Sequence, residues 1–233
     1  MEDKRYNELT VGEIVANDFR TAEIFKKAGI DFCCGGKKSL ELSCSEKGIN
    51  PEIIKEDLDK IMQLPVNQAQ NFKDWDLTFL CDYIVNTHHK FVLKTLPELV
   101  FYTQKISLVH GANHPELDEI SDLFKRINTE LLQHLKNEEE VLFPAIKEVI
   151  ANGNVEAKSK IISEINRMSD EHEFAGGAMD QINDLSKNYA LPVDACNTYQ
   201  VTFKLLRQFE DDLHVHVHLE NNILYPKAMT LAN

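Results

Sequence analysis

Three turn signals divide residues 77–233 into four segments of helical pattern and constrain the fold more than any other feature. They are residues 111–115 (Gly-Ala-Asn-His-Pro), 152–154 (Asn-Gly-Asn) and 191–192 (Leu-Pro), which are residue types that end helices. The segments are each roughly 30–40 residues long, as in a bundle of long helices with short loops. No stretch shows the β-branched alternation of a strand. We therefore predict an all-α chain that ends in an up-down-up-down four-helix bundle.

The first 63 residues have the pattern of a small helical domain with four short helices. Thr10 and Glu13 are spaced as a capping box, Gly29 and Gly48 are helix stops, and Asn50 with the following proline opens a further helix. The stretch that follows contains a proline and lacks sustained periodicity, which is typical of a linker. The predicted organisation is a small helical domain over 1–63, a linker over 64–76 and the bundle over 77–233.

Composition excludes several classes of protein. The chain has 38 acidic and 25 basic residues, a formal charge of −13, and no concentrated basic footprint for a nucleic-acid partner. No apolar run approaches the roughly 20 residues that cross a bilayer, so we expect no membrane partner. The five cysteines are an odd count, and two of them are adjacent, which does not suggest a disulfide framework. We therefore predict a cytoplasmic protein.

A repeated motif in the second and fourth bundle segments carries the strongest functional signal. The sequence His134-x3-Glu138-x3-Leu142-Phe143-Pro144 recurs as His216-x3-Glu220-x3-Leu224-Tyr225-Pro226. Residues four apart share one helix face, so each histidine and its glutamate can reach the same ion in the bundle core. A single His-x3-Glu pair is more often a surface pair or a core histidine, but two copies with shared flanks favour a metal site.

The other two segments each supply one further histidine at a matching height. His89 and His172 lie about as far from their loops as His134 and His216 do, to within about two helical turns. The remaining histidines point to other faces or lie near a loop and are excluded: His88, His110, His114, His214 and His218. Of these, His110 is the least secure exclusion, because Pro97 could kink its helix.

Four imidazoles and two carboxylates restrict the choice of metal. The set is too rich in nitrogen for calcium or magnesium and has more ligands than one tetrahedral zinc ion takes. Each glutamate can bridge two ions, which leaves two histidines for each ion and open positions for oxide, dioxygen or nitric oxide. Two non-haem iron ions are the natural assignment, although manganese or a mixed pair fits the same ligand types.

Residues 28–36, Ala-Gly-Ile-Asp-Phe-Cys-Cys-Gly-Gly, add a second motif. With the two repeats, it makes nearly the whole chain resemble the iron–sulfur cluster repair di-iron proteins (repair of iron centres, or RIC, family), in which a Cys-Cys-Gly-Gly domain precedes a hemerythrin-like bundle. The resemblance implies repair of clusters damaged by nitric oxide or peroxide, by iron donated from a labile site with an oxo or hydroxo bridge. It also implies terminal ligands His89, His134, His172 and His216 and bridging ligands Glu138 and Glu220.

Two alternative functions stay open at this stage. One is a hemerythrin-like sensor of oxygen or redox state, and the other is an enzyme that reduces nitric oxide or peroxide. Oxygen-carrying hemerythrins have a further histidine one turn from the third-helix ligand, whereas this chain has Met168 and Gly176 there, which argues against simple oxygen carriage. The expected partners are damaged iron–sulfur proteins, nitric oxide or dioxygen, and a second copy of the chain in a homodimer.

Cys33 and Cys34 are the candidate reactive residues of the small domain. Lys37, Lys38 and a helix starting near Ser39 are expected to lower the pKa of these thiols. The pair could transfer nitric oxide, hand off iron or sense redox state, or it could be a buried pair without a function. We expect the other three cysteines to be packing residues: Cys44, Cys81 and Cys196. Acidic residues beside the histidines, such as Glu171 and Asp212, are expected either to orient an imidazole or to be solvated.

Overall fold

The structure is a computed structural model that describes residues 6, 8–64 and 71–233, and every regular element in these residues is a helix. Backbone contacts divide the chain into two compact units. One unit combines residues 1–81 with residues 214–233, and the other comprises residues 82–213. None of the described helices has the length and apolar character needed to cross a membrane. The all-α prediction is confirmed.

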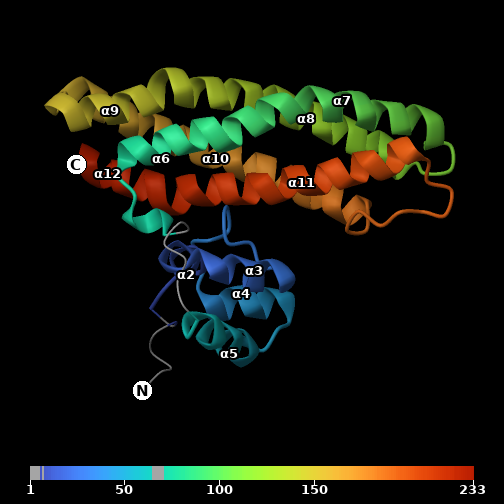
Figure 1. The fold of residues 1–233 in the computed structure, drawn as a ribbon, viewed down its shortest axis with the longest axis horizontal. Helices are drawn as coiled ribbons and strands as arrows, with labels where there is room; N and C mark the ends of the chain where they lie inside the picture. Colours follow the sequence, from blue (N-terminus) through green and yellow to red (C-terminus); the bar gives the residue numbers. More distant parts are fainter. Residues whose placement is uncertain (1–5, 7, 65–70) are drawn as a thin grey trace. The chain divides into compact units, whose positions relative to one another are not determined.

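The predicted short helices of the first unit form as expected. They are α2 (Val11–Asn17), α3 (Ala22–Lys27), α4 (Leu40–Lys47) and α5 (Pro51–Met62) (Figure 1). A 3₁₀ turn that was not predicted, η1 (Phe19–Thr21), lies between α2 and α3. The capping box is present, because the Thr10 hydroxyl accepts the Glu13 N–H at 3.2 Å and the Glu13 carboxylate accepts the Thr10 N–H at 2.8 Å. Gly48 ends α4 in the left-handed conformation, with φ 66°.

The predicted linker, 64–76, is only partly described. Residues 65–70 lie outside the described residues, and a 3₁₀ turn η3 (Phe72–Asp74) precedes the first bundle helix. The Lys227 ammonium donates to the carbonyl oxygens of Lys73 and Trp75 at 2.6 and 2.8 Å, so this turn is held by the last helix. The exact domain boundaries stay a prediction.

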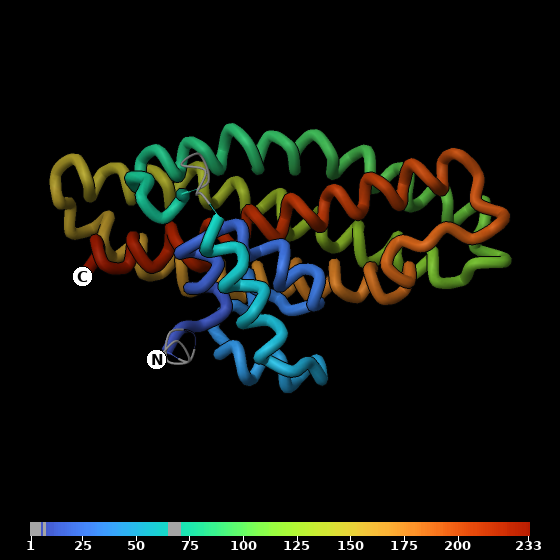
Figure 2. The backbone as a smooth tube through the Cα atoms, turned by 60° about the horizontal axis from the view of Figure 1, so that its bottom comes forward, coloured from blue at the N-terminus to red at the C-terminus, as the bar shows by residue number. Residues whose placement is uncertain are grey.

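The remaining helices follow the predicted segmentation. They are α6 (Leu77–Ile84), α7 (Lys90–His110), α8 (Glu116–Asn137), α9 (Phe143–Asn152), α10 (Val155–Leu185), α11 (Asn197–Leu219) and α12 (Tyr225–Ala232). The turns between the long segments fall at 111–115, 153–154 and 186–196, where glycine, asparagine and proline predicted them. Helices α7, α8 and α10 run side by side in both views (Figures 1 and 2), and the Phe124 and Phe209 rings, 5.3 Å apart, pack α8 against α11.

Three of the long segments contain a π-helical turn that the sequence analysis did not predict. These turns are η4 (Val85–His89), η5 (Glu138–Leu142) and η6 (Glu220–Leu224). Pro144 and Pro226 follow η5 and η6 directly in the first turn of the next helix. A proline inside a helix has no N–H to donate and crowds the carbonyl four residues earlier, which favours a rewound turn before Pro144 and Pro226. Each π-turn begins or ends at a predicted metal ligand, and such turns are frequent at functional sites.

Candidate metal centre

Glu138 lies at the centre of the predicted ligand set. As the first residue of η5, it places its Oε2 atom 3.3 Å from Nε2 of His89 and 3.3 Å from Nε2 of His134. All three side chains are essentially inaccessible to solvent. A buried carboxylate is costly unless positive charge or hydrogen bonds compensate it. A carboxylate that faces two ring nitrogens is placed to share a cation with either imidazole.

The remaining ligand pairs are equally close. His134 and His172 approach with their Nε2 atoms 2.9 Å apart, and His216 Nε2 lies 2.9 Å from Glu220 Oε1 one helical turn later. Two neutral imidazoles cannot both direct lone pairs at each other at this distance, so the first pair needs a shared proton or a cation. The donor set therefore fits a metal ion.

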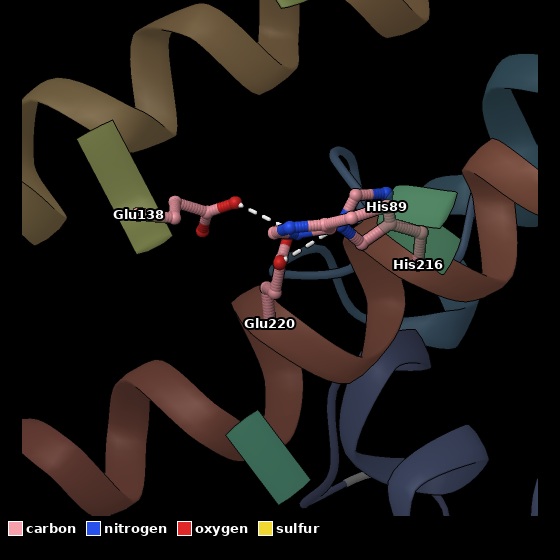
Figure 3. A group of neighbouring side chains, drawn as sticks. All are labelled: His89, Glu138, His216 and Glu220. Atoms are coloured by element: carbon pink, nitrogen blue, oxygen red, sulfur yellow. Dashed lines mark hydrogen bonds and ion pairs between the residues drawn. The ribbon is translucent and has the colours of Figure 1, made fainter. Parts of the chain in front are cut away.

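The six predicted ligands form two groups that share both glutamates. One group comprises His89, Glu138, His216 and Glu220, and the other comprises His134, Glu138, His172 and Glu220. Within each group, one potential ligand atom from every residue lies within 4.8 Å of the others. Figure 3 shows the first group, with both carboxylates directed at the two imidazole rings. Both groups are buried clusters of side chains that could hold a cation.

Acidic side chains hold the outer nitrogens of two of these rings. Glu139 Oε1 lies 2.8 Å from Nδ1 of His89, and Glu171 Oε2 lies 2.7 Å from Nδ1 of His134. The hydrogen bond from His134 lowers the pKa of Glu171, and the Arg167 guanidinium donates to its other oxygen at 2.5 Å. An imidazole that donates through Nδ1 presents a lone pair at Nε2, as metal-bound histidines do.

The acidic partners of these histidines differ from the ones expected from their positions in the sequence. Glu171, which is next to His172 in sequence, bonds to His134 instead. Asp212, expected near His216, lies 2.9 Å from the Nδ1 atom of His88. Glu139 was missed, although it is adjacent to Glu138. None of the excluded histidines belongs to the two ligand groups: His88, His110, His114, His214 and His218.

The electrostatic environment of Cys33 differs from the one expected from the sequence. The Cys33 thiol is buried and donates to Asp31 Oδ1 at 3.1 Å, with the Cys34 sulfur 3.9 Å away. The bond to Cys34, burial and the negative charge of Asp31 raise the pKa of Cys33 well above its usual value. Lys38 is engaged elsewhere, in an ion pair with Glu46 at 2.7 Å. The expected lowering of the pKa was wrong for Cys33.

Asn222 connects this segment to the C-terminal helices within the first unit. Its amide donates to the carbonyl oxygens of Phe32 and Cys33 at 3.2 and 3.4 Å and lies 3.1 Å from His218 Nδ1. Gly12 allows this approach, because a Cβ atom at residue 12 would overlap the Asn222 side chain. Asn222 is two residues beyond Glu220, so one helical turn carries both a predicted ligand and a contact to the cysteines.

Comparison with known proteins found a matching family for each of the two parts of the chain. Residues 7–62 match a family described as a domain of unknown function (DUF542), and residues 82–228 match the hemerythrin HHE cation binding domain. The iron-sulfur cluster repair protein ScdA of Staphylococcus haemolyticus is 34% identical over 223 residues, which cover 95% of this chain and 98% of that protein. The iron-sulfur cluster repair protein YtfE of Escherichia coli O8 is 30% identical over 228 residues, or 96% and 98%. The chain therefore belongs to the family of iron-sulfur cluster repair proteins, with a hemerythrin cation-binding domain.

Proposed function

We propose that this chain repairs iron–sulfur clusters damaged by nitrosative or oxidative stress, by donating iron from a centre bridged by Glu138 and Glu220. The observation that carries the proposal is the position of the buried Glu138 carboxylate, 3.3 Å from ring nitrogens of both His89 and His134. Family membership supports cluster repair as the purpose of this site.

The two ligand groups that share their glutamates support two iron ions per chain as part of this proposal. Each ion would have two imidazoles and one oxygen from each bridge, which is fewer than the six ligands that iron commonly takes. Bound iron supplies redox chemistry and open positions for an oxo or hydroxo bridge, dioxygen or nitric oxide. Glu139 and Glu171 keep His89 and His134 in the ligating tautomer, and the low ligand count favours release.

Cys33 and Cys34 are proposed as functional residues in the transfer of iron. Together with Asp31 they form a third group of potential metal ligands, and two sulfurs with a carboxylate suit iron. The raised pKa keeps Cys33 protonated at neutral pH, so a cation must displace the thiol proton in order to bind. Damaged iron–sulfur proteins are the proposed recipients.

The metal content of anaerobically purified protein tests the centre. We expect two irons per wild-type chain and less than one in Glu138→Gln, because the amide cannot bridge as a carboxylate does. Glu140→Gln is the matched control, since Glu140 is exposed on the same π-turn and should leave the iron content unchanged. Zinc in the wild type, or equal loss in both variants, would contradict the di-iron assignment.

Transfer to an acceptor tests repair itself. Iron-loaded wild type should restore the cluster of an apo iron–sulfur protein when sulfide is supplied, and Cys33→Ser should slow the transfer while it retains its iron. Catalytic turnover of nitric oxide or peroxide with a reductant, without transfer, would favour a reductase instead. The homodimer and the cytoplasmic location remain predictions.

A further inference from the structure

Cys196 lies far from the metal ligands and has a close histidine partner. It immediately precedes α11, and its thiol is exposed. Nε2 of His110, the last residue of α7, lies 3.2 Å from the Cys196 sulfur. The Tyr199 ring, which is only 1% exposed, packs edge-on against the His110 ring at 5.4 Å. The last residue of α7 and the residue before α11 thus place a base and a nucleophile within hydrogen-bonding distance.

A second histidine, His114, contacts the segment that carries Cys196. His114 Nε2 lies 2.9 Å from Asp194 Oδ1, and Tyr199 also packs against the His114 ring at 5.8 Å. Glu116 lies 3.4 Å from the other nitrogen of His114. The charged groups around the thiol are therefore two histidines and two carboxylates, and the carboxylates pair with His114 rather than with His110.

This environment stabilises the thiolate of Cys196. The backbone N–H of Tyr199, followed by the His110 ring and the N–H of Thr198, lowers the pKa of Cys196 to about 7. N–H groups at a helix N-terminus and a neighbouring imidazole are established means of activating cysteine. In contrast, Cys44 and Cys81 are completely buried. The expectation that Cys196 is a packing residue was wrong.

We propose that Cys196, paired with His110, is a modification site that forms a mixed disulfide with low-molecular-weight disulfides. The thiolate sulfur attacks one sulfur of the disulfide, whose S–S bond breaks as a new S–S bond to Cys196 forms. The other half of the disulfide leaves as a thiolate, so Cys196 is oxidised, the leaving half is reduced, and no further oxidant is needed. The site is separate from the metal centre, because His89 and His110 lie about 30 Å apart along the helix axis.

The pH dependence of thiol reactivity tests this proposal. The iron-loaded protein is mixed with an aromatic nitrobenzoate disulfide, whose released thiolate is followed by absorbance between pH 5.5 and 9.5. We expect a fast phase with a midpoint near 7 that is absent in Cys196→Ser, which retains its iron. In His110→Gln the midpoint should rise by about one pH unit, and the rate at pH 6 should fall several-fold.

His114→Gln is the matched control, because it removes a neighbouring imidazole that does not contact the sulfur, and its midpoint should stay near 7. Peptide mass analysis after exposure to glutathione disulfide should locate the adduct on Cys196. The proposal is overturned if the fast phase persists in Cys196→Ser, or if the wild-type midpoint is that of an ordinary thiol. A shift in His114→Gln as large as that in His110→Gln would equally overturn the pairing with His110.

Discussion

At the scale of single residues, two imidazoles of the candidate centre use their two nitrogens for different purposes. In His89 and His134 the Nε2 atom faces Glu138, while the Nδ1 atom faces Glu139 or Glu171. The outer carboxylate fixes the tautomer and makes the inner nitrogen a better ligand. Removing the charge of one outer carboxylate should therefore weaken the metal site without touching a ligand.

Glu171→Gln tests that role. We expect the affinity for iron to fall about 10–100-fold, as is common when such an outer partner of a ligating histidine is lost. Affinity is measured by anaerobic competition with a chelator. The control is Glu173→Gln, an exposed residue on the same helix, which should keep wild-type affinity; equal loss in both variants would show a general charge effect instead.

At the scale of helices, the backbone conformation at Gly153 and at Gly177 decides whether each position tolerates alanine. Gly153 ends α9 with φ 70°, a conformation that a Cβ atom disfavours. Gly177 lies within α10, where an added Cβ would meet no atom within 4 Å. The same substitution at the two glycines should consequently have effects of opposite sign on stability.

Gly153→Ala should lower the free energy of unfolding by about 1 kcal/mol, because alanine is strained in the left-handed conformation. Gly177→Ala should raise it by about 0.5–1 kcal/mol, since alanine favours the helix. Both are measured by denaturant unfolding at equal iron loading. If both variants are destabilised by similar amounts, the conformational explanation fails.

At the scale of the whole molecule, the Cys-Cys segment and residues 214–233 belong to one compact unit. Asn222 holds the segment through the Phe32 and Cys33 carbonyls, and burial lowers the pKa of the adjoining His218 to about 4. The accessibility of the Cys33 thiol should therefore depend on the Asn222 contact.

Asn222→Ala and Gly12→Ala should both speed alkylation of Cys33 several-fold, because each disturbs this contact from one side. The rate is followed by mass spectrometry of the peptide that contains Cys33. Thr230→Ala is the control, as the Thr230 hydroxyl bonds to the carbonyl of Pro226 in its own helix. Unchanged alkylation in both test variants would show that other packing holds the segment.

The sequence by itself determined the helical class, the positions of the turns and the shared face of each His-x3-Glu pair. These features depend on interactions within one helical turn or on capping residues such as Thr10 and Gly48, so they can be read locally. The roles of the six predicted ligands stay a prediction, although the structure brings their ligand atoms together.

Only the tertiary structure decided which charge faces which ring or thiol. Glu171 reaches His134 across 37 positions of sequence, and His110 reaches Cys196 across 86. The lysines near the cysteines in sequence predicted the wrong direction for the pKa shift of Cys33. In the structure, Lys38 forms an ion pair with Glu46, while Asp31 faces the Cys33 thiol. Electrostatic effects depend on distance in space and on burial, and both are set by how the helices pack.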